Sequence, residues 1–160
     1  MIEMTNMDLQ HLHTVLEETF AANFVAYYRA HVAHINIKGR TFYQDHKLLQ
    51  KIYEYLQDNI DTLGEKIRST RAYIPASLQT VVGISPLLDM DCSGSAIDML
   101  NSIEEVLEAL IDQYHLLNAA AEDVNYVDIS NYAQDQIGQI AKWRWMIEAT
   151  LDERDESEDY

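Results

Sequence analysis

Two histidines, His34 and His46, stand on either side of a Lys-Gly turn in the segment HINIKGRTFYQDH. Further along the chain, Asp61 and Glu65 are four residues apart, and His46 and Gln50 have the same spacing. Residues four apart lie on one face of a helix, so each pair presents its side chains together. Imidazole nitrogen combined with carboxylate oxygen is a ligand set of first-row metals such as iron and zinc. These residues therefore predict a metal site.

The histidines and the acidic pair cannot meet within one chain. His46 and Asp61 lie fifteen positions apart on one predicted helix, which separates them by about 22 Å. Metal–ligand bonds are only about 2 Å long. A site that uses both groups must therefore be completed by a second, antiparallel copy of the chain, related by a two-fold axis. The alternative that spacing alone leaves open is an exposed polar helix face that binds nothing.

Helical periodicity supplies the elements that position these residues. Apolar residues recur every three or four positions in four segments, which predicts four amphipathic helices. The expected helices span about 8–36, 41–71, 95–124 and 129–152, with Asp8 as the first N-cap and an acidic tail at 153–160. Residues 73–95 contain both prolines and predict a long crossover with one short helix near SLQTVV. This order predicts a single all-α domain, a ferritin-like four-helix bundle with one long crossover.

The composition limits the partners of the chain. Its 160 residues include 27 acidic and 11 basic side chains, which gives a net charge of −16. Such a surface repels nucleic-acid phosphates and anionic lipid headgroups and attracts cations. A single cysteine, Cys92, excludes an intrachain disulfide and suits a reducing compartment. The first residues, MIEMTNMDLQ, lack the features of a signal peptide, and no apolar run is long enough to span a membrane, so we expect a cytoplasmic protein.

The predicted site resembles that of the Dps family of mini-ferritins. The family pattern is approximately H-W-N-x-x-G-x-x-F-x-x-x-H followed by D-x-x-A-E-R, and this chain reads HINIKGRTFYQDH and then DTLGEKI. The segment KWRWMIEATL is similar to part of the family's last helix, and the resemblance covers roughly residues 8–151. It implies a hollow dodecamer that oxidises Fe(II) with hydrogen peroxide, or more slowly with dioxygen. The family stores the ferric mineral inside the shell and thereby protects against oxidative damage.

The resemblance also implies roles for single residues. By carry-over, His34 and His46 come from one chain and Asp61 and Glu65 from its partner, with Glu65 bridging two irons and zinc as a substitute metal. Family members usually have Asp or Glu at the position of Gln50. A neutral amide binds a hard cation less well than a carboxylate does, so we predict a weakened second iron position.

Three further features concern the surroundings of the site. Ile35 stands where the family usually has tryptophan, and His31, one turn before His34, is expected to support or pack beside the site rather than bind metal. The resemblance places iron-entry pores at three-fold axes near the turn between the third and fourth long helices. The candidate pore residues are Glu122, Asp123, Asp128 and Asp135. The alternative is an ordinary acidic turn with Asp128 as a helix cap.

Direct DNA binding is not expected. In the family it commonly uses a lysine-rich terminal extension, which releases counterions from phosphates. Neither MIEMTNMD nor DERDESEDY offers such a basic arm.

Two rival functions share the bundle fold. Larger ferritins hold a di-iron site inside each bundle with Glu-x-x-His motifs, and the nearest approach here is Asp112 to His115 in DQYH, with Glu17 or Glu18 on the first helix. The other rival is a non-catalytic shell or binding protein that has lost its iron chemistry. In that case the neutral Gln50, in place of the family's carboxylate, would reflect the loss.

Overall fold

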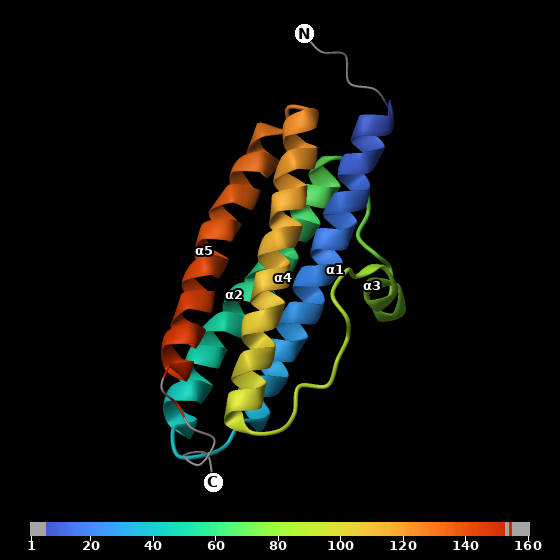
Figure 1. Ribbon diagram of the computed structural model, residues 1–160. Coiled ribbons are helices and arrows are strands. Elements are labelled where there is room, and N and C mark those ends of the chain that lie inside the picture. Colours follow the sequence, from blue (N-terminus) through green and yellow to red (C-terminus); the bar gives the residue numbers. More distant parts are fainter. Residues whose placement is uncertain (1–5, 153, 155–160) are drawn as a thin grey trace.

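Four long helices lie side by side in the computed structural model, which describes residues 6–152 and 154 (Figure 1). The helices are α1 (Asn6–Asn36), α2 (Phe42–Ser69), α3 (Leu78–Ile84), α4 (Ala96–Asp123) and α5 (Val127–Leu151). The short helix α3 stands apart from the other four and contacts α1. No helix within these described ranges is both long enough and apolar enough to cross a membrane.

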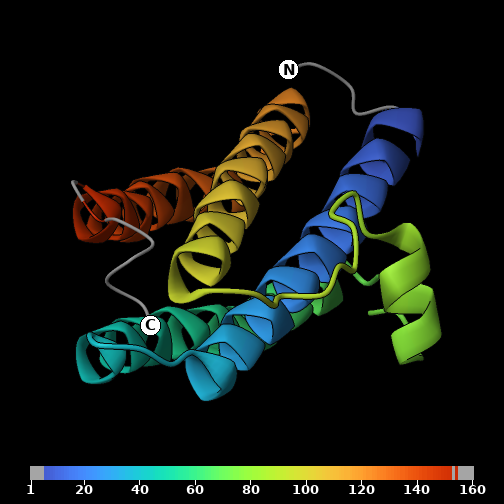
Figure 2. The same cartoon turned by 60° about the horizontal axis from the view of Figure 1, so that its bottom comes forward.

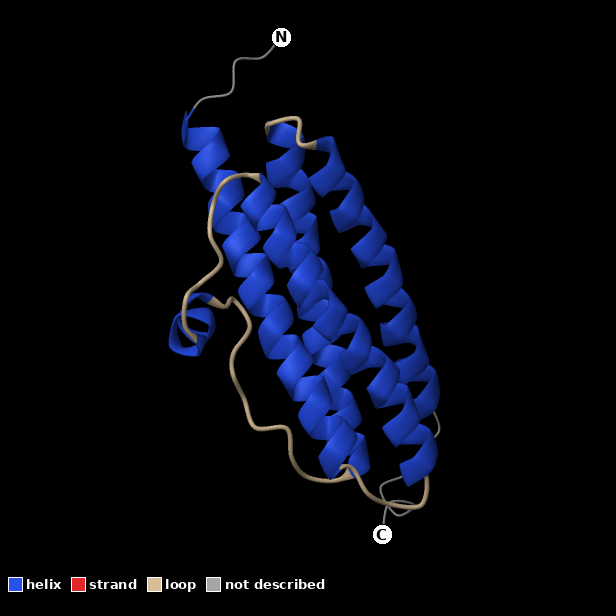
Figure 3. Cartoon of the chain, turned by 180° about the vertical axis from the view of Figure 1, so that it is seen from behind, coloured by secondary structure: helices blue, strands red, loops and turns tan. Residues whose placement is uncertain are grey.

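The long crossover determines the relative directions of the four long helices. α1 and α2 form one antiparallel hairpin and α4 and α5 form another, each joined by a short turn (Figure 1). Between the hairpins, the long loop that contains α3 carries the chain back along the bundle (Figure 3). As a result α2 and α4 run in the same direction. This arrangement confirms the predicted ferritin-like four-helix bundle with one long crossover.

Local sequence signals explain where the helices begin. The Ser95 side chain accepts a hydrogen bond from the Asp98 amide, and the Asp98 carboxylate accepts one from the Ser95 amide, which is a complete capping box for α4. Ser77 caps α3 through the Thr80 amide. Gly94, immediately before the box, has φ +102°. A Cβ at Gly94 would lie 2.5 Å from Asp98 Oδ2, so only glycine leaves this cap intact.

Two expected caps are wrong. α1 is described from Asn6, so Asp8 lies inside its first turn rather than at the N-cap. Asp128 likewise lies in the first turn of α5, whose N-cap position is Tyr126 and carries no side-chain cap bond. Both carboxylates sit where the positive end of the helix dipole favours a negative charge, which explains why acidic residues are found there without capping.

The helices α2 and α5 are joined through long polar and aromatic side chains. Asn59 on α2 donates to Gln136 on α5 at 3.1 Å, and Tyr132 on α5 donates back to Asn59 at 3.0 Å. Tyr55 also donates to Gln136. The α4–α5 pair lies opposite the α1–α2 pair when the bundle is viewed closer to its axis (Figure 2). This network therefore connects the two hairpins across one side of the bundle.

Arg154, which belongs to the predicted acidic tail, packs against the bundle. Arg154 donates to both carboxylate oxygens of Asp45, at 2.9 and 3.2 Å, and also to the Thr41 hydroxyl. The Arg154 side chain is 6% exposed and that of Asp45 is 1% exposed. Thr41 and Asp45 bracket the start of α2, so Arg154 is joined to the α1–α2 turn. Residues 153 and 155–160 of the predicted tail lie outside the described part.

Candidate functional site

The two predicted histidine ligands meet at one end of the bundle. His34 lies in the last turn of α1 and His46 in the second turn of α2. His34 Nδ1 donates to the His46 carbonyl oxygen at 2.8 Å, and His46 Nδ1 donates to the His34 carbonyl oxygen at 2.7 Å. A carbonyl oxygen can only accept, so each Nδ1 must carry the hydrogen. Each Nε2 of the neutral ring then has its lone pair free, as a metal ligand requires.

Packing fixes the orientation of these rings. The His34 and His46 rings stack with centroids 3.8 Å apart and planes inclined by 15°. His34 is buried, and burial is the main cause that lowers its pKa below the ordinary value, assisted by the charge of His46 and of His31. A lowered pKa keeps the imidazole neutral at neutral pH, and only the neutral ring binds metal. Both rings are therefore held in the tautomer that suits coordination, and burial also favours the neutral form of His34.

His31 is engaged by two tyrosines. Its Nδ1 lies 2.9 Å from the Tyr27 hydroxyl, and its ring stacks on Tyr53 with centroids 4.0 Å apart. Tyr53 in turn packs its ring against His34 with centroids 4.9 Å apart. These contacts place His31 beside the histidine pair in a layer of packed aromatic rings. The role of His31 toward a metal stays a prediction.

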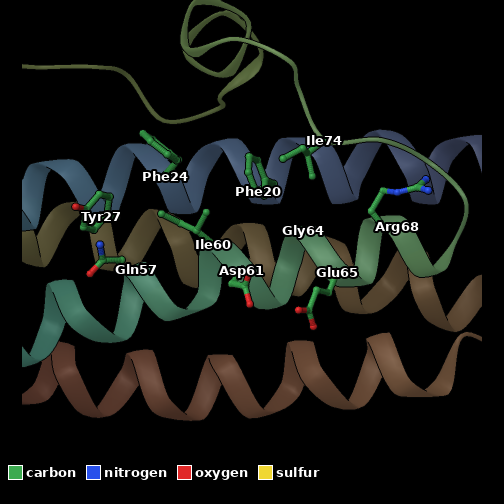
Figure 4. A pocket seen from close by; sticks show the side chains of 10 residues that line it. All are labelled: Phe20, Phe24, Tyr27, Gln57, Ile60, Asp61, Gly64, Glu65, Arg68 and Ile74. Carbon is green, nitrogen blue, oxygen red and sulfur yellow. The ribbon is translucent and has the colours of Figure 1, made fainter.

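The predicted acidic ligands lie further along α2. Asp61 and Glu65 are both exposed and occupy neighbouring turns on one side of the helix (Figure 4). They border a groove of about 790 Å³ whose other walls are largely apolar. Its remaining lining residues are Phe20, Phe24, Tyr27, Gln57, Ile60, Gly64, Arg68 and Ile74. The carboxylates thus sit beside an open apolar surface rather than inside the bundle.

The chain brings together only half of the predicted ligand set. His34 and His46 are in contact, whereas Asp61 and Glu65 belong to turns of α2 about 22 Å and more from His46 along the helix. Within residues 6–152 and 154 there is no group of three or more His, Cys, Asp or Glu side chains that could hold a metal ion. One copy of the chain therefore does not contain a complete site.

Glu54 is a neighbour of the site that the sequence reasoning missed. Gln50, at the position where a carboxylate was expected, donates from Nε2 to Glu54 Oε1 at 2.9 Å. The charge of Glu54 also acts on His34, whose pKa it raises against the larger effect of burial. The signal was present in the sequence, because Glu54 extends the four-residue spacing from His46 to Gln50 by one more step.

The candidate pore residues gather at the opposite end of the bundle from the histidines. They lie at the end of α4 and along the first part of α5, and all four are exposed: Glu122, Asp123, Asp128 and Asp135. Asn118 donates to Glu122 at 3.3 Å, and Lys66 lies 3.8 Å from Asp128. The last turn of α4 contains no basic residue, so its acidic side chains face the negative end of the helix dipole without compensation.

Two residues of the rival intra-bundle site, Asp112 and His115, are exposed, while its candidates on the first helix, Glu17 and Glu18, are half-buried. Asp112 and His115 are exposed on α4, and the core at this level is filled by neighbouring residues instead. Buried Gln113 donates to Thr19 at 3.1 Å, and buried Asn23 donates to the Leu56 carbonyl at 2.8 Å. Neutral amides and a hydroxyl thus occupy the centre of the bundle, where a di-iron site requires carboxylates.

Comparison with known proteins defines the class. The family model described as the ferritin-like domain matches residues 14–156, and the chain belongs to this family. More particularly, the chain is 28% identical over 138 residues to the DNA protection during starvation protein of Helicobacter pylori, covering 86% of this chain and 96% of that protein. It is 24% identical over 128 residues to antigen TpF1 of Treponema pallidum, covering 79% and 72% of the two chains.

Solved structures confirm the resemblance to Dps proteins at the level of the fold. A Dps protein from Bacillus brevis superimposes with a TM-score of 0.87 at 22% identity, covering 93% of this chain and 100% of that one. A second match is a Dps protein from Vibrio cholerae, described as a member of a broad superfamily of ferritin-like diiron-carboxylate proteins. It superimposes with a TM-score of 0.86 at 24% identity, covering 91% of this chain and 92% of that one.

Proposed function

We propose that this protein is an iron-storing mini-ferritin that oxidises Fe(II) at sites shared between two subunits. Hydrogen peroxide is the preferred oxidant and dioxygen the slower one. The observation that carries the proposal is the reciprocal hydrogen bonding of His34 and His46, because it leaves two Nε2 lone pairs free at one place. A purely structural histidine pair has no need of two free ring nitrogens.

A second copy of the chain supplies the missing carboxylates. The groove beside Asp61 and Glu65 is walled by apolar residues of α1, α2 and the crossover, which apart from buried Phe20 are exposed or half-buried (Figure 4). Two antiparallel copies related by a two-fold axis cover this surface mutually, and each brings its acidic pair toward the other's histidines. Two equivalent sites per dimer follow from the symmetry. We propose that these dimers assemble further into a hollow dodecamer, and the resemblance to Dps proteins supports this step.

The ligand roles follow from the chemistry of each group. His34 with the partner's Asp61 and the partner's Glu65 forms the first iron position, and His46 with Gln50 forms the second, with the partner's Glu65 bridging the two. Carboxylate oxygens favour Fe(III) over Fe(II) because they are hard anionic ligands, so they stabilise the oxidised product. Two adjacent Fe(II) ions give one electron each to a peroxide, which leaves as two waters after taking up two protons. Zinc competes for the same mixed nitrogen and oxygen ligands.

The acidic surface serves iron uptake in this proposal. The net charge of −16 attracts Fe(II) and raises its local concentration. The exposed carboxylates near the α4–α5 turn, in particular Glu122 and Asp128, line the entry pores. The same charge repels nucleic-acid phosphates, so the protein protects the cell by consuming peroxide and Fe(II) rather than by coating DNA.

The direct test is the formation of ferric product in the assembled apo-protein. Fe(II) is added without oxygen, peroxide follows, and ferric absorbance is recorded for the wild type and for Asp61→Ala. We expect fast oxidation in the wild type and loss of most of the rate in the variant. Asp58→Ala, which removes an exposed carboxylate from the same helix outside the proposed ligand set, is the matched control and should oxidise iron normally. Equal traces for the wild type and Asp61→Ala would favour a non-catalytic shell.

A further inference from the structure

Gln50 stands where the Dps family usually has a carboxylate, and among the described residues its amide forms a side-chain hydrogen bond through its nitrogen end. Its Nε2 donates to Glu54 Oε1 at 2.9 Å, one helical turn further along α2. Gln50 is half-buried, while Glu54 is exposed and makes no ion pair with a residue that the structure describes. The bond from Gln50 is therefore the only hydrogen bond that the Glu54 carboxylate makes with a residue that the structure describes.

The chemistry of the two groups makes this contact directional. An amide has a donating nitrogen end and an accepting oxygen end, whereas an ionised carboxylate can only accept. Glu54 must therefore take the nitrogen end of Gln50. The oxygen end, which is the end able to bind a cation, is then not used by Glu54, and His46 lies one turn earlier on the same face of α2. A free glutamine would present either end.

We infer that Glu54 is a positioning residue that makes Gln50 an effective metal ligand. Glu54 holds the amide by its nitrogen, so that Gln50 Oε1 faces the second iron position beside His46. This inference rests on the proposed function. It changes the expectation that Gln50 weakens the second iron position. The second position is weakened less by the neutral side chain than the sequence suggests, because the amide oxygen is oriented before the metal arrives.

Anaerobic Fe(II) titration of the assembled apo-protein by calorimetry tests this role. The wild type should bind two Fe(II) ions per subunit. Glu54→Ala should weaken the second site about tenfold, since it removes a hydrogen bond with one charged partner. Glu54→Gln should weaken it only about twofold, because an amide at position 54 accepts or donates equally well and leaves about half of the molecules correctly oriented. Titration at about 0.5 M salt suppresses the long-range effect of the lost charge.

Variants that carry Gln50→Glu distinguish two roles of Glu54, namely orientation of the side chain at position 50 and direct binding of the metal. In Gln50→Glu both ends of the side chain are oxygen, so its orientation no longer matters. Adding Glu54→Ala to Gln50→Glu should then change the affinity by less than about twofold. A similar loss in both backgrounds would show that Glu54 binds the metal itself or supports the fold, and would overturn the inference. Asp58→Ala is the control for removing one carboxylate from α2 and should bind both ions normally.

The outcomes also distinguish this inference from the proposed function. A wild type that binds no Fe(II) would end both. A wild type that binds iron with the same two affinities as Glu54→Ala, or that binds only one ion per subunit, would end the role of Glu54 and leave the shared iron site in place.

Discussion

His46 donates a hydrogen bond to a carbonyl at the end of α1 with the same ring that we propose as a metal ligand. The His34 carbonyl is among the last four of α1, which have no partner within their own helix. His46 Nδ1 donates to it at 2.7 Å. Because His34 returns the same bond to the His46 carbonyl, each histidine closes the α1–α2 turn and sets the tautomer of its own ring.

His46→Phe tests this double role. Phenylalanine keeps a ring between His34 and Phe42, which contact His46 on its two sides, but it leaves the His34 carbonyl without its donor. We expect a loss of about 1 to 3 kcal/mol in stability together with loss of the second iron. Thermal unfolding and Fe(II) titration measure the two effects. His115→Phe, at an exposed position of α4, should change neither.

Mixed assembly tests whether the site is shared. One variant carries His34→Ala and His46→Ala, the other Asp61→Ala and Glu65→Ala, and neither should oxidise iron alone. A dimer of the two has one site in which both histidines and both carboxylates are replaced and one site in which all four are present. Random co-assembly in equal amounts should therefore restore about one quarter of the sites. Absence of any recovery in confirmed mixed dimers would show that the ligands do not combine across subunits.

The buried pair of Asp45 and Arg154 predicts a large stability effect. Arg154→Ala leaves the carboxylate of Asp45, which is 1% exposed, without its charged partner and with only the Thr41 hydroxyl as a hydrogen-bond donor from a side chain. Removing one member of a buried ion pair costs about 3 to 5 kcal/mol. We expect a lower thermal midpoint, whereas Arg40→Ala, in the exposed turn nearby, should leave it unchanged. An unchanged midpoint for Arg154→Ala would mean that the end of the chain does not hold the α1–α2 turn in solution.

Buried tyrosines predict a loss of stability at alkaline pH. Burial raises the pKa of Tyr132 from 10.0 to about 12, and it raises the pKa of Tyr55 and Tyr114 as well. Between pH 10 and about 12 the unfolded chain loses a proton from Tyr132 that the folded chain retains. The unfolded state then binds fewer protons, so stability falls as pH rises through this window and is unaffected by Tyr132 below it.

Denaturant unfolding at several alkaline pH values measures this slope. Tyr132→Phe should make it shallower, because the residue can no longer ionise. Tyr43→Phe removes an exposed phenol and is the matched control. The same slope in Tyr132→Phe as in the wild type would rule out Tyr132 as a contributor.

Asp112→Asn separates the shared site from the rival site inside the bundle. Asp112 is exposed, and the adjacent core position is taken by Gln113 with its bond to Thr19. We expect the rate of Fe(II) oxidation by peroxide to stay within about twofold of the wild type. A loss comparable to that of Asp61→Ala would place the chemistry inside the bundle instead.

The sequence determined the bundle because its information is local and repeated. The apolar spacing that places Leu49, Ile52 and Leu56 on one face of α2 follows from 3.6 residues per turn, and all three are fully buried. The helix starts were less certain, since Asp8 and Asp128 suit both a cap and a first turn. The separation of His46 from Asp61 also followed from the sequence, because the rise of a helix is constant.

Only the tertiary structure decided how the polar side chains meet. The sequence gives no means of seeing that two imidazoles exchange hydrogen bonds with each other's backbone, since that depends on the closing angle of the α1–α2 turn. Arg154 reaches Asp45 across more than a hundred positions of the chain. Asn59 and Gln136, on α2 and α5, meet across 77 positions of the chain. Such contacts depend on distance in space and on donor direction, and neither is encoded in the spacing of residues along one helix.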